Sequence, residues 1–215
     1  MTVLTDTRPT DPAVTERAPA RSTRNLGWLL LIGGLIGLLA SAVLLIEKIE
    51  LIRDPDYIPT CSFNPVMACG SVMTSWQGEV FGIPNPIIGV AAFPMVMALG
   101  AALLAGARPA RWFWGLFLAG TTFGALMVTW LAHQSLYSIG FLCPYCMVVW
   151  AVTIPIFVFT LAHVASGRDQ DPDAHPSTGF GGTVLSLRWV LIFFWFGLWT
   201  ALILVRFWDY WSTLF

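Results

Sequence analysis

Four cysteines are the residues of this chain whose type and spacing point most directly to chemistry. They form two local pairs, Cys61 with Cys69 and Cys143 with Cys146. The second pair is a C-x-x-C motif, and Pro144 within it suits the first turn of a helix that begins there. Unpaired N–H groups and the dipole of a helix N-terminus stabilise a thiolate. The motif therefore predicts a reactive, easily exchanged disulfide.

The first pair is separated by seven residues, in a segment rich in turn formers. Such a loop can close a disulfide, and it can also swing to deliver a thiol elsewhere. The turn-forming residues are Pro59, Asn64, Pro65 and Gly70.

The composition places these cysteines in a membrane protein. Of 215 residues, 57% are hydrophobic and only 11% are charged, whereas a soluble domain is about a quarter charged. This excludes a disordered chain, a nucleic-acid binder and a small secreted disulfide scaffold. The net charge of -1 also argues against a polyanionic partner.

Five apolar runs are each close to the roughly 20 residues that one crossing of a bilayer needs. We expect an all-α integral membrane protein, with a four-helix bundle and a fifth, peripheral transmembrane helix. The expected spans are 26–46, 86–106, 112–133, 146–165 and 189–208. The expected divisions are a disordered tail over 1–25, a redox core over 26–165 with a polar loop and surface helix over 47–83, a polar loop over 166–187, and the last helix with a short tail over 188–215.

Basic residues predict the orientation, because loops that stay in the cytoplasm carry most Lys and Arg. Eight fall on one side of the five spans and three on the other, so the N-terminus is expected inside and the C-terminus outside. All four cysteines then face the outer, oxidising compartment, where disulfides persist. The eight are Arg8, Arg17, Arg21, Arg24, Arg108, Arg111, Arg168 and Arg188; the three are Lys48, Arg53 and Arg206.

Three interpretations of the cysteine pairs were weighed on these grounds. A staple across three helical residues removes little chain entropy, so it is a poor stabiliser. Four thiolates can bind zinc, but an oxidising compartment and an apolar helix end disfavour a metal site. A redox relay through the two pairs is favoured.

A relay needs an electron acceptor. No glycine-rich nucleotide cradle follows a strand. The three histidines, His133, His163 and His175, are too dispersed to pair on one haem iron. A quinone dissolved in the membrane remains, by elimination.

The segment between the first cysteine pair and the second span has apolar residues at helical spacing. Residues 70–81 are expected to form one short amphipathic helix on the membrane surface, with Trp76 roofing a pocket above the bundle. Asn85 is expected to cap the second span, with Pro86 in its first turn. Its amide NH₂ would remain free to bind a quinone carbonyl.

Taken together, these motifs resemble the bacterial members of the vitamin K epoxide reductase family. The resemblance runs over 26–165 and rests on the cysteine pair of 61–69, on Ser75-Trp76, on the segment 81–89, and on the C-x-x-C of 143–146. It implies a membrane enzyme that oxidises thiols with a quinone, either menaquinone or ubiquinone, and needs no metal or nucleotide. It also implies the cell (inner) membrane of a bacterium, with the active site facing outward.

The resemblance assigns roles to individual residues. Cys61 and Cys69 are the shuttle pair, and Cys61 meets the partner protein. Cys69 then passes electrons to Cys143, and Cys146 leaves as a thiolate stabilised by the helix N-terminus and reduces the quinone. Asn85 matches a quinone-contacting asparagine.

Three further residues, Ser75, Trp76 and Trp150, are expected to contact the quinone together with Asn85. Ser75 matches a serine of the shuttle segment, and Trp76 follows it. Trp150 stands where the vertebrate enzyme has a tyrosine near its ligand. Some bacterial relatives carry a fused thioredoxin-like domain after the fifth span. Since this sequence ends at Phe215, a separate thioredoxin-fold partner is expected, together with the membrane quinone pool.

Two other functions were weighed. The unrelated four-helix bacterial disulfide oxidoreductase also uses two outer cysteine pairs and a quinone, but the fifth span and the context of Ser75, Trp76 and Asn85 favour the vitamin K epoxide reductase family. A transporter or structural membrane protein with stapled loops is the alternative of a different class. Spans one to four carry no charged residue, which argues against an ion path.

Small residues recur at four-residue spacing in two spans. They indicate either close packing between helices of one bundle or a dimer face, and we favour packing. They are Gly33, Gly37 and Ser41 in the first span, and Gly120 and Gly124 in the third.

Overall fold

A computed structural model describes residues 21–167 and 180–212, apart from 63 and 65. The tail predicted over 1–25 lies outside this range up to residue 20, as does most of the predicted loop over 166–187. The first described residues already belong to a helix, because α1 begins at Arg21.

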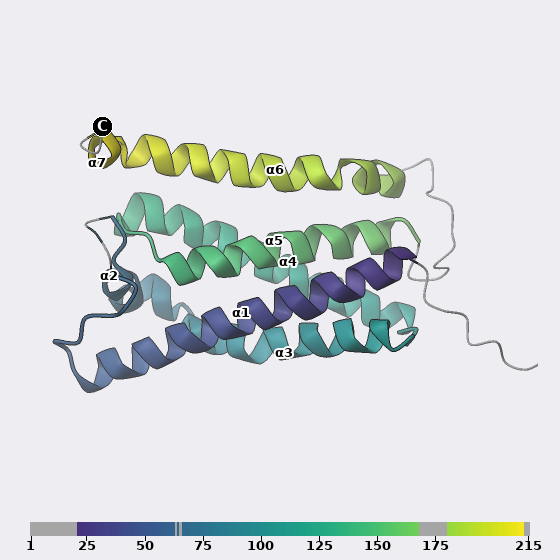
Figure 1. Ribbon diagram of the computed structural model, residues 1–215, viewed down its shortest axis with the longest axis horizontal. Coiled ribbons are helices and arrows are strands. Elements are labelled where there is room, and N and C mark those ends of the chain that lie inside the picture. Colours follow the sequence, from purple (N-terminus) through teal and green to yellow (C-terminus); the bar gives the residue numbers. More distant parts are fainter. Residues whose placement is uncertain (1–20, 63, 65, 168–179, 213–215) are drawn as a thin grey trace, which may run out of the picture.

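Five long helices make up the described part of the chain (Figure 1). All five are long and apolar enough to cross a membrane, so the expected all-helical membrane architecture is confirmed. They are α1 (Arg21–Arg53), α3 (Asn85–Leu104), α4 (Arg111–Gln134), α5 (Pro144–Ala165) and α6 (Phe180–Arg206). The shorter elements are α2 (Cys69–Thr74), the 3-10 turn η1 (Trp76–Glu79), the π-helical turn η2 (Ser135–Ile139) and α7 (Trp208–Ser212).

The surface segment differs from the expectation of one helix over 70–81. The helix α2 ends before Ser75, whose ψ of 151° is extended, and η1 begins directly after it. The Ser75 hydroxyl donates to the Val72 carbonyl at 2.7 Å and so satisfies one of the carbonyls left open at the end of α2. A serine that bonds to its own backbone competes with helix continuation, which explains the break.

The helices pack as a bundle with one open seam. The helix α1 lies against α3 and α5, α4 lies against α5, and α6 lies on the far side of α5 (Figure 1). Although α3 and α4 are joined by a short loop, they scarcely contact each other.

The small residues of α1 face neighbouring helices of the same chain. A Cβ atom at Gly37 would clash with the Phe93 ring, and one at Gly33 would lie 3.3 Å from Ile156. Ser41 is approached by α3 in the same way, since a Cβ at Gly89 would meet its side chain. This agrees with the packing interpretation of the stripe on α1.

The fifth long helix, α6, is fastened to the bundle by two side-chain bonds. The Trp195 indole donates to the Thr129 hydroxyl at 3.2 Å, and Arg206 Nε donates to the Leu136 carbonyl at 3.2 Å. Ile192 and Trp199 add apolar contacts to the core of α4 and α5. The opposite face of α6 exposes large apolar side chains, as expected for a helix that meets lipid.

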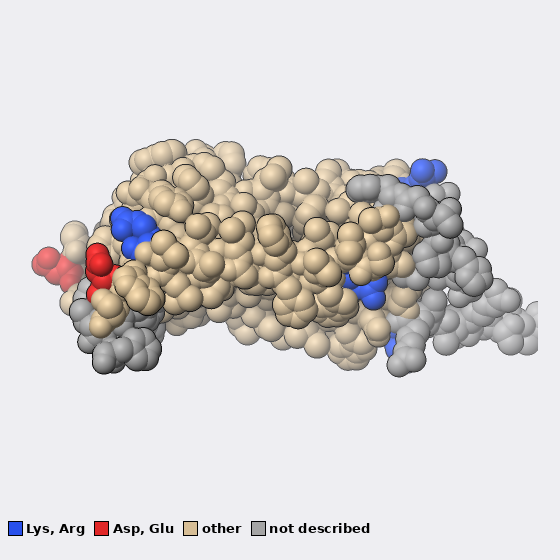
Figure 2. Space-filling view, turned by 90° about the horizontal axis from the view of Figure 1, so that it is seen from above, with Lys and Arg blue, Asp and Glu red and all other residues tan. Residues whose placement is uncertain are grey.

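Charged side chains gather at the two ends of the elongated bundle, with an uncharged band between them (Figure 2). The described acidic residues all belong to the end that carries the cysteines: Glu47, Glu50, Asp54, Asp56, Glu79 and Asp209. This distribution and the five apolar helices make the chain a multi-pass membrane protein.

The close approach of α1 and α3 gives a stability prediction. A Cβ at Gly100 would lie 2.6 Å from the Leu31 backbone nitrogen and 2.8 Å from the Gly27 carbonyl oxygen, so Gly100→Ala must push the two helices apart. We expect a loss of about 1–3 kcal/mol in the free energy of unfolding. The measurement is unfolding in detergent, followed by circular dichroism.

Gly115→Ala on α4 is the matched control, because nothing lies within 4 Å of a Cβ there. That change should be neutral or slightly stabilising, since Ala favours a helix over Gly. Equal stability of the two variants would contradict the tight α1–α3 contact.

Candidate functional site

Three of the four cysteine sulfurs meet at one end of the bundle. Cys61 and Cys69 form a disulfide with a Cα–Cα distance of 5.7 Å. The Cys69 Sγ lies 3.1 Å from the Cys143 Sγ, and Cys143 and Cys146 are free thiols. The structure thus brings together residues that are 74 positions apart, with the sulfur of one pair in contact with the sulfur of the other.

Two short pieces of extended backbone hold this contact. Met67 pairs with Leu142 in an isolated parallel bridge, and the Leu142 N–H donates to the Val66 carbonyl at 2.9 Å. Each strand of the bridge leads directly into one partner, Cys69 on one side and Cys143 on the other. The Asn64 side-chain oxygen accepts from the N–H groups of Val66 and Met67, at 2.9 and 2.8 Å, and fixes the turn before the bridge.

A left-handed glycine delivers the second strand. Gly140 has φ of +76° and ends the π-helical turn η2, its N–H donating to the Ser135 carbonyl at 2.9 Å. This conformation is readily accessible only to glycine. It turns the chain sharply from α4 so that residues 141–143 can run back to the start of α5.

Cys143 is the N-cap of α5, and its surroundings favour the thiolate. Hydrogen bonding by the Cys146 side chain lowers the pKa of Cys143 most, and the backbone N–H groups of Cys146 and Tyr145 lower it further, against the opposing effect of burial. The family resemblance assigns the thiolate stabilised by the helix N-terminus to Cys146. In the structure the donors at the N-terminus of α5 converge on Cys143 instead.

The three clustered sulfurs are not three free thiolates. The sulfurs of Cys61, Cys69 and Cys143 lie within 4.8 Å of one another. Two of them are joined in a disulfide, and zinc binds thiolates. The arrangement is that of a disulfide next to a thiol.

A buried carboxylate fastens the loop in front of Cys61. Glu47 accepts a hydrogen bond from the Tyr57 hydroxyl at 2.9 Å, and it also accepts from the backbone N–H of Thr60 at 3.2 Å and from the Thr60 hydroxyl. The hydrogen bond to the Glu47 carboxylate raises the pKa of Tyr57, because losing the phenolic proton would break that bond and place two anions together. The segment 57–60 is thereby tied to α1, and Cys61 follows it directly.

A large cavity begins beside Cys146 and runs along the seam between α3 and α4. Its volume is about 920 Å³. The far end is lined by Pro109 and Phe113, near the opposite end of the bundle, so the cavity extends through most of its length. The wall is almost entirely apolar, which suits a lipophilic molecule with a long tail.

Two of the predicted quinone-contacting residues line this cavity and two do not. Asn85 and Trp150 lie in its wall with Cys146. Ser75, whose hydroxyl is committed to Val72, and Trp76 are not among the lining residues. Trp76 is 66% exposed, and its ring meets Trp130 edge-on at 5.9 Å.

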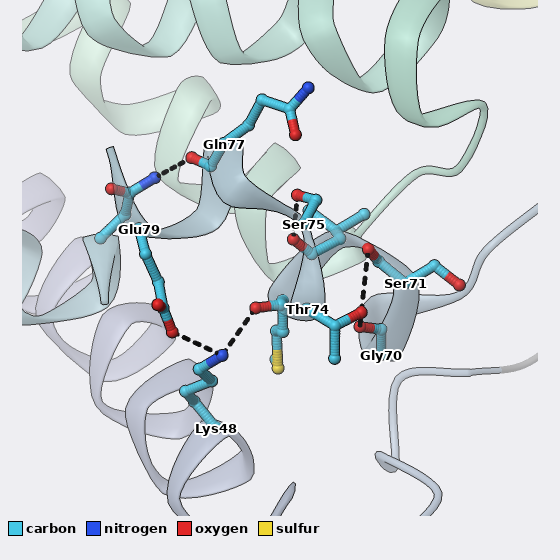
Figure 3. A network of polar contacts seen from close by, with 10 residues as sticks. Lys48, Gly70, Ser71, Thr74, Ser75, Gln77 and Glu79 are labelled. Carbon is cyan, nitrogen blue, oxygen red and sulfur yellow. Dashed lines mark hydrogen bonds and ion pairs between the residues drawn. The ribbon is translucent and has the colours of Figure 1, made fainter. Parts of the chain in front are cut away.

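Asn85 has a different role from the expected cap. The N-cap of α3 is Pro84, and no side chain caps this helix. Asn85 is its first residue and donates its amide Nδ2 to the Gln77 carbonyl at 2.7 Å (Figure 3). Its Oδ1 is buried and has no hydrogen-bond partner among the described residues. A buried acceptor of this kind, at a cavity wall, is suited to a ligand donor.

Sequence reasoning missed two polar residues of the cavity, Gln77 and Lys48. Gln77 is buried because the break at Ser75 changes the direction of the turn that follows it. The sequence indicates Lys48 only as a basic residue on the outer side of the membrane. It lies inside the extended α1, and its ammonium reaches the carbonyl of Met73 and the carboxylate of Glu79 (Figure 3).

The region that holds this site also matches a known protein family. The family model described as "Vitamin K epoxide reductase family" matches residues 28–161, from α1 to near the end of α5. The chain belongs to the vitamin K epoxide reductase family. The match includes all four cysteines, Asn85 and Trp150, whereas α6 lies beyond it. A search of curated proteins finds no significant match.

Membership of the vitamin K epoxide reductase family makes the chain an oxidoreductase of the membrane, and the family is associated with disulfide chemistry and with quinone. The disulfide beside a free thiol and the adjoining apolar cavity are consistent with that assignment. The predicted family resemblance is therefore confirmed.

The hydrogen bond between the two C-x-x-C side chains gives a prediction on the pKa of Cys143. Cys146→Ala removes the largest stabilising donor, so the pKa of Cys143 should rise toward the usual value of about 8.5. At neutral pH the thiolate fraction falls accordingly. The measurement is a pH titration of thiolate absorbance with the Cys61–Cys69 disulfide closed, which leaves Cys143 as the only thiol.

Cys146→Ser is the matched control, because its hydroxyl can still donate to the Cys143 sulfur. Its midpoint should lie below that of the alanine variant. Identical midpoints would show that the Cys146 side chain does not stabilise the Cys143 thiolate.

Proposed function

We propose that this protein reoxidises a separate thioredoxin-fold partner and passes two electrons to a membrane quinone, so driving disulfide formation in exported proteins. The observation that supports this most strongly is the 3.1 Å contact between Cys69 and Cys143, with Cys146 at the wall of the cavity. Thiol–disulfide exchange needs one sulfur positioned to attack another, and the two pairs already adjoin.

The relay follows from the positions of the sulfurs. The partner's thiolate attacks the Cys61–Cys69 disulfide at Cys61, and Cys69 is released. The Cys69 thiolate then attacks an oxidised Cys143–Cys146 pair at Cys143, and Cys146 is released beside the cavity as a thiolate. The partner's second thiolate displaces Cys61, and the partner leaves with its own disulfide. The Cys61 thiolate then attacks Cys69, which closes the Cys61–Cys69 disulfide again and releases Cys143 as a thiolate.

In the conformation described here the Cys61–Cys69 pair is oxidised and the Cys143–Cys146 pair is reduced. This is the state on the product side of the exchange between Cys69 and Cys143.

The cavity supports a quinone as the acceptor. Its apolar wall between α3 and α4 suits a polyprenyl tail, and its polar groups lie at the cysteine end, where a headgroup would meet Cys146. Asn85 would hold the headgroup through the remaining N–H of its amide or through its unpartnered Oδ1. Trp150 would pack against it. When bound, the quinone accepts two electrons and two protons.

The first exchange step requires the loop to open. Cys61 and Cys69 are 0% exposed and Cys143 is 1% exposed, so no partner protein can reach the sulfurs in this conformation. Release of the segment 57–60 from Glu47 would uncover Cys61. The closed state is then the state of internal transfer, and an open state is the one that meets the partner.

The charge distribution supports an orientation with the cysteine end outward in a bacterial cell membrane. The basic residues described at the other end belong to short connections and helix starts: Arg24, Arg108, Arg111 and Arg188. Acidic residues are described only at the cysteine end. The positive-inside rule then places the sulfurs in the outer, oxidising compartment.

The function is tested with purified protein, dithiothreitol and short-tailed analogues of ubiquinone and menaquinone. We expect quinone reduction by the wild type and none by Cys146→Ala. Cys61→Ala should keep the reaction with dithiothreitol but lose the oxidation of a thioredoxin-fold substrate. If the wild type reduces neither quinone, the cysteines are structural staples and the relay is wrong. If Cys146→Ala still turns over, the assignment of Cys146 is wrong.

A second prediction concerns the tail. Gly120 lines the cavity and has no atom within 4 Å of a built Cβ, so Gly120→Leu fits without strain but occupies part of the space. If it displaces two methylenes of the tail, at about 0.8 kcal/mol each, binding weakens roughly tenfold. The measurement is the KM for a long-tailed quinone against that for a tailless one, which should be unaffected.

Gly115→Leu is the control on the same helix. It also has open space around its Cβ but does not line the cavity. An equal KM for the long-tailed quinone in both variants would place the tail elsewhere.

A further inference from the structure

Reduction of a quinone to a quinol needs two protons as well as two electrons. The electrons come from Cys143 and Cys146 as they form their disulfide. A Cys146 thiol can supply one proton, but the Cys143 sulfur is released from its exchange with Cys69 as a thiolate and brings none. A second proton donor is therefore required at the cysteine end of the cavity.

Among the described residues that line the cavity, Lys48 and Cys146 are the only ones with ionisable side chains. The other polar members are amides and hydroxyls, which do not release a proton near neutral pH. Lys48 comes from α1, near its C-terminal end, and is 8% exposed. A buried cation in a membrane bundle usually marks a functional site.

The ammonium of Lys48 is held in place by two contacts from the redox segment. Its Nζ donates to the Met73 carbonyl at 2.8 Å and pairs with Glu79 Oε1 at 2.7 Å (Figure 3). An ammonium has three donors, so one remains for a ligand. The same segment also holds Asn85 in place, because the Gln77 carbonyl accepts a hydrogen bond from the Asn85 amide. Asn85 lines the same cavity.

Glu79 connects this site to the aqueous surface. Its side chain is 42% exposed, whereas that of Lys48 is 10% exposed. The pair therefore joins a solvent-facing carboxylate to a cation at the cavity wall. Water at the surface can return a proton to Lys48 through Glu79 without passing through the apolar seam.

We propose that Lys48 is a catalytic acid, donating a proton from Nζ to one oxygen of the quinone headgroup. In the balanced step the Cys143–Cys146 S–S bond forms and two electrons pass to the quinone. One proton comes from the Cys146 thiol and the other from Lys48, and the product is the quinol. Lys48 regains its proton from outer water by way of Glu79. The inference rests on the quinone reduction proposed above.

A purely structural role for Lys48 would be to clamp the redox segment onto α1. Lys48→Arg distinguishes the two roles, because arginine keeps the charge and the donors but does not release its proton. Lys48→Met removes the charge, the donors and the proton while keeping a similar length. Arg53→Met is the matched control, since Arg53 is another α1 cation paired with an acid, Glu50, but it does not line the cavity.

The experiment uses full-length protein in lipid nanodiscs and a decyl-tailed benzoquinone. Single-turnover reduction of the quinone by the reduced Cys143–Cys146 pair is followed by absorbance. Quinone binding is measured separately by quenching of tryptophan fluorescence. Exchange between the Cys61–Cys69 disulfide and Cys143 is followed by thiol trapping without quinone, and thermal unfolding is recorded for each variant.

We expect Lys48→Arg to bind the quinone and exchange disulfides as the wild type does, but to reduce the quinone about a hundredfold more slowly. Lys48→Met should show the same slow reduction and about tenfold weaker binding, because one charge-assisted hydrogen bond is lost. Arg53→Met should match the wild type in every assay.

Three results would overturn the inference. If Lys48→Arg reduces the quinone as fast as the wild type, Lys48 is not the acid. If Lys48→Arg slows disulfide exchange and quinone reduction equally, Lys48 is a clamp. If the wild type itself does not reduce the quinone, the proposed function fails together with the inference, whereas in the first two cases the proposed function stands.

Discussion

The contact between the Cys69 and Cys143 sulfurs is the interaction on which the rest of the structure depends. Exchange between two sulfurs requires separations of a few ångströms, and these residues lie on different segments of the chain. The Met67–Leu142 bridge aligns the two backbones, the Gly140 turn brings one of them back from α4, and α5 starts directly after Cys143. Each of these three features positions the Cys69 or the Cys143 sulfur, so a small displacement of any one of them separates the two cysteine pairs.

The same contact imposes a conflict between transfer and access. Complete burial protects the internal exchange from water and from unrelated thiols, but it also hides Cys61 from the partner protein proposed to reduce it. The hydrogen bonds from Tyr57 and Thr60 to Glu47 hold the loop before Cys61 in the closed position. They are few and local, and segments held by few contacts open at much lower cost than the whole fold. Opening at 57–60 therefore leaves the five helices and the cavity intact.

The sequence alone predicts those features that are local or compositional. Five long apolar helices follow from five apolar runs, and the Cys61–Cys69 disulfide follows from two cysteines close together in a loop rich in turn formers. The C-x-x-C motif predicts a second disulfide, whereas Cys143 and Cys146 are free thiols in this conformation. The resemblance also placed Asn85 and Trp150 near the ligand, and both line the cavity. The features that escaped prediction depend on contacts between distant segments. Asn85 bonds to Gln77 rather than capping α3, and Ser75 breaks a helix that an unbroken apolar pattern predicts. Lys48 follows the predicted end of the first span, and only the extension of α1 and the position of Met73 and Glu79 bring it to the cavity.

The distribution of polarity in the cavity explains why electrons and protons must arrive at the same place. Burying a charge in an apolar wall is costly unless it is paired, so the seam between α3 and α4 can bind a tail but cannot conduct a proton. At the cysteine end, Lys48 is paired with Glu79 and hydrogen-bonded to the backbone, which makes one cation tolerable there. Cys146 lies at the wall of the same cavity. In the proposed function, electrons from the thiols and protons from the outer surface therefore converge on a headgroup held at that end. The apolar seam excludes charge from most of the cavity, and the Lys48–Glu79 pair stabilises a charge at the cysteine end. Both features therefore confine the movement of charge to one end of the bundle.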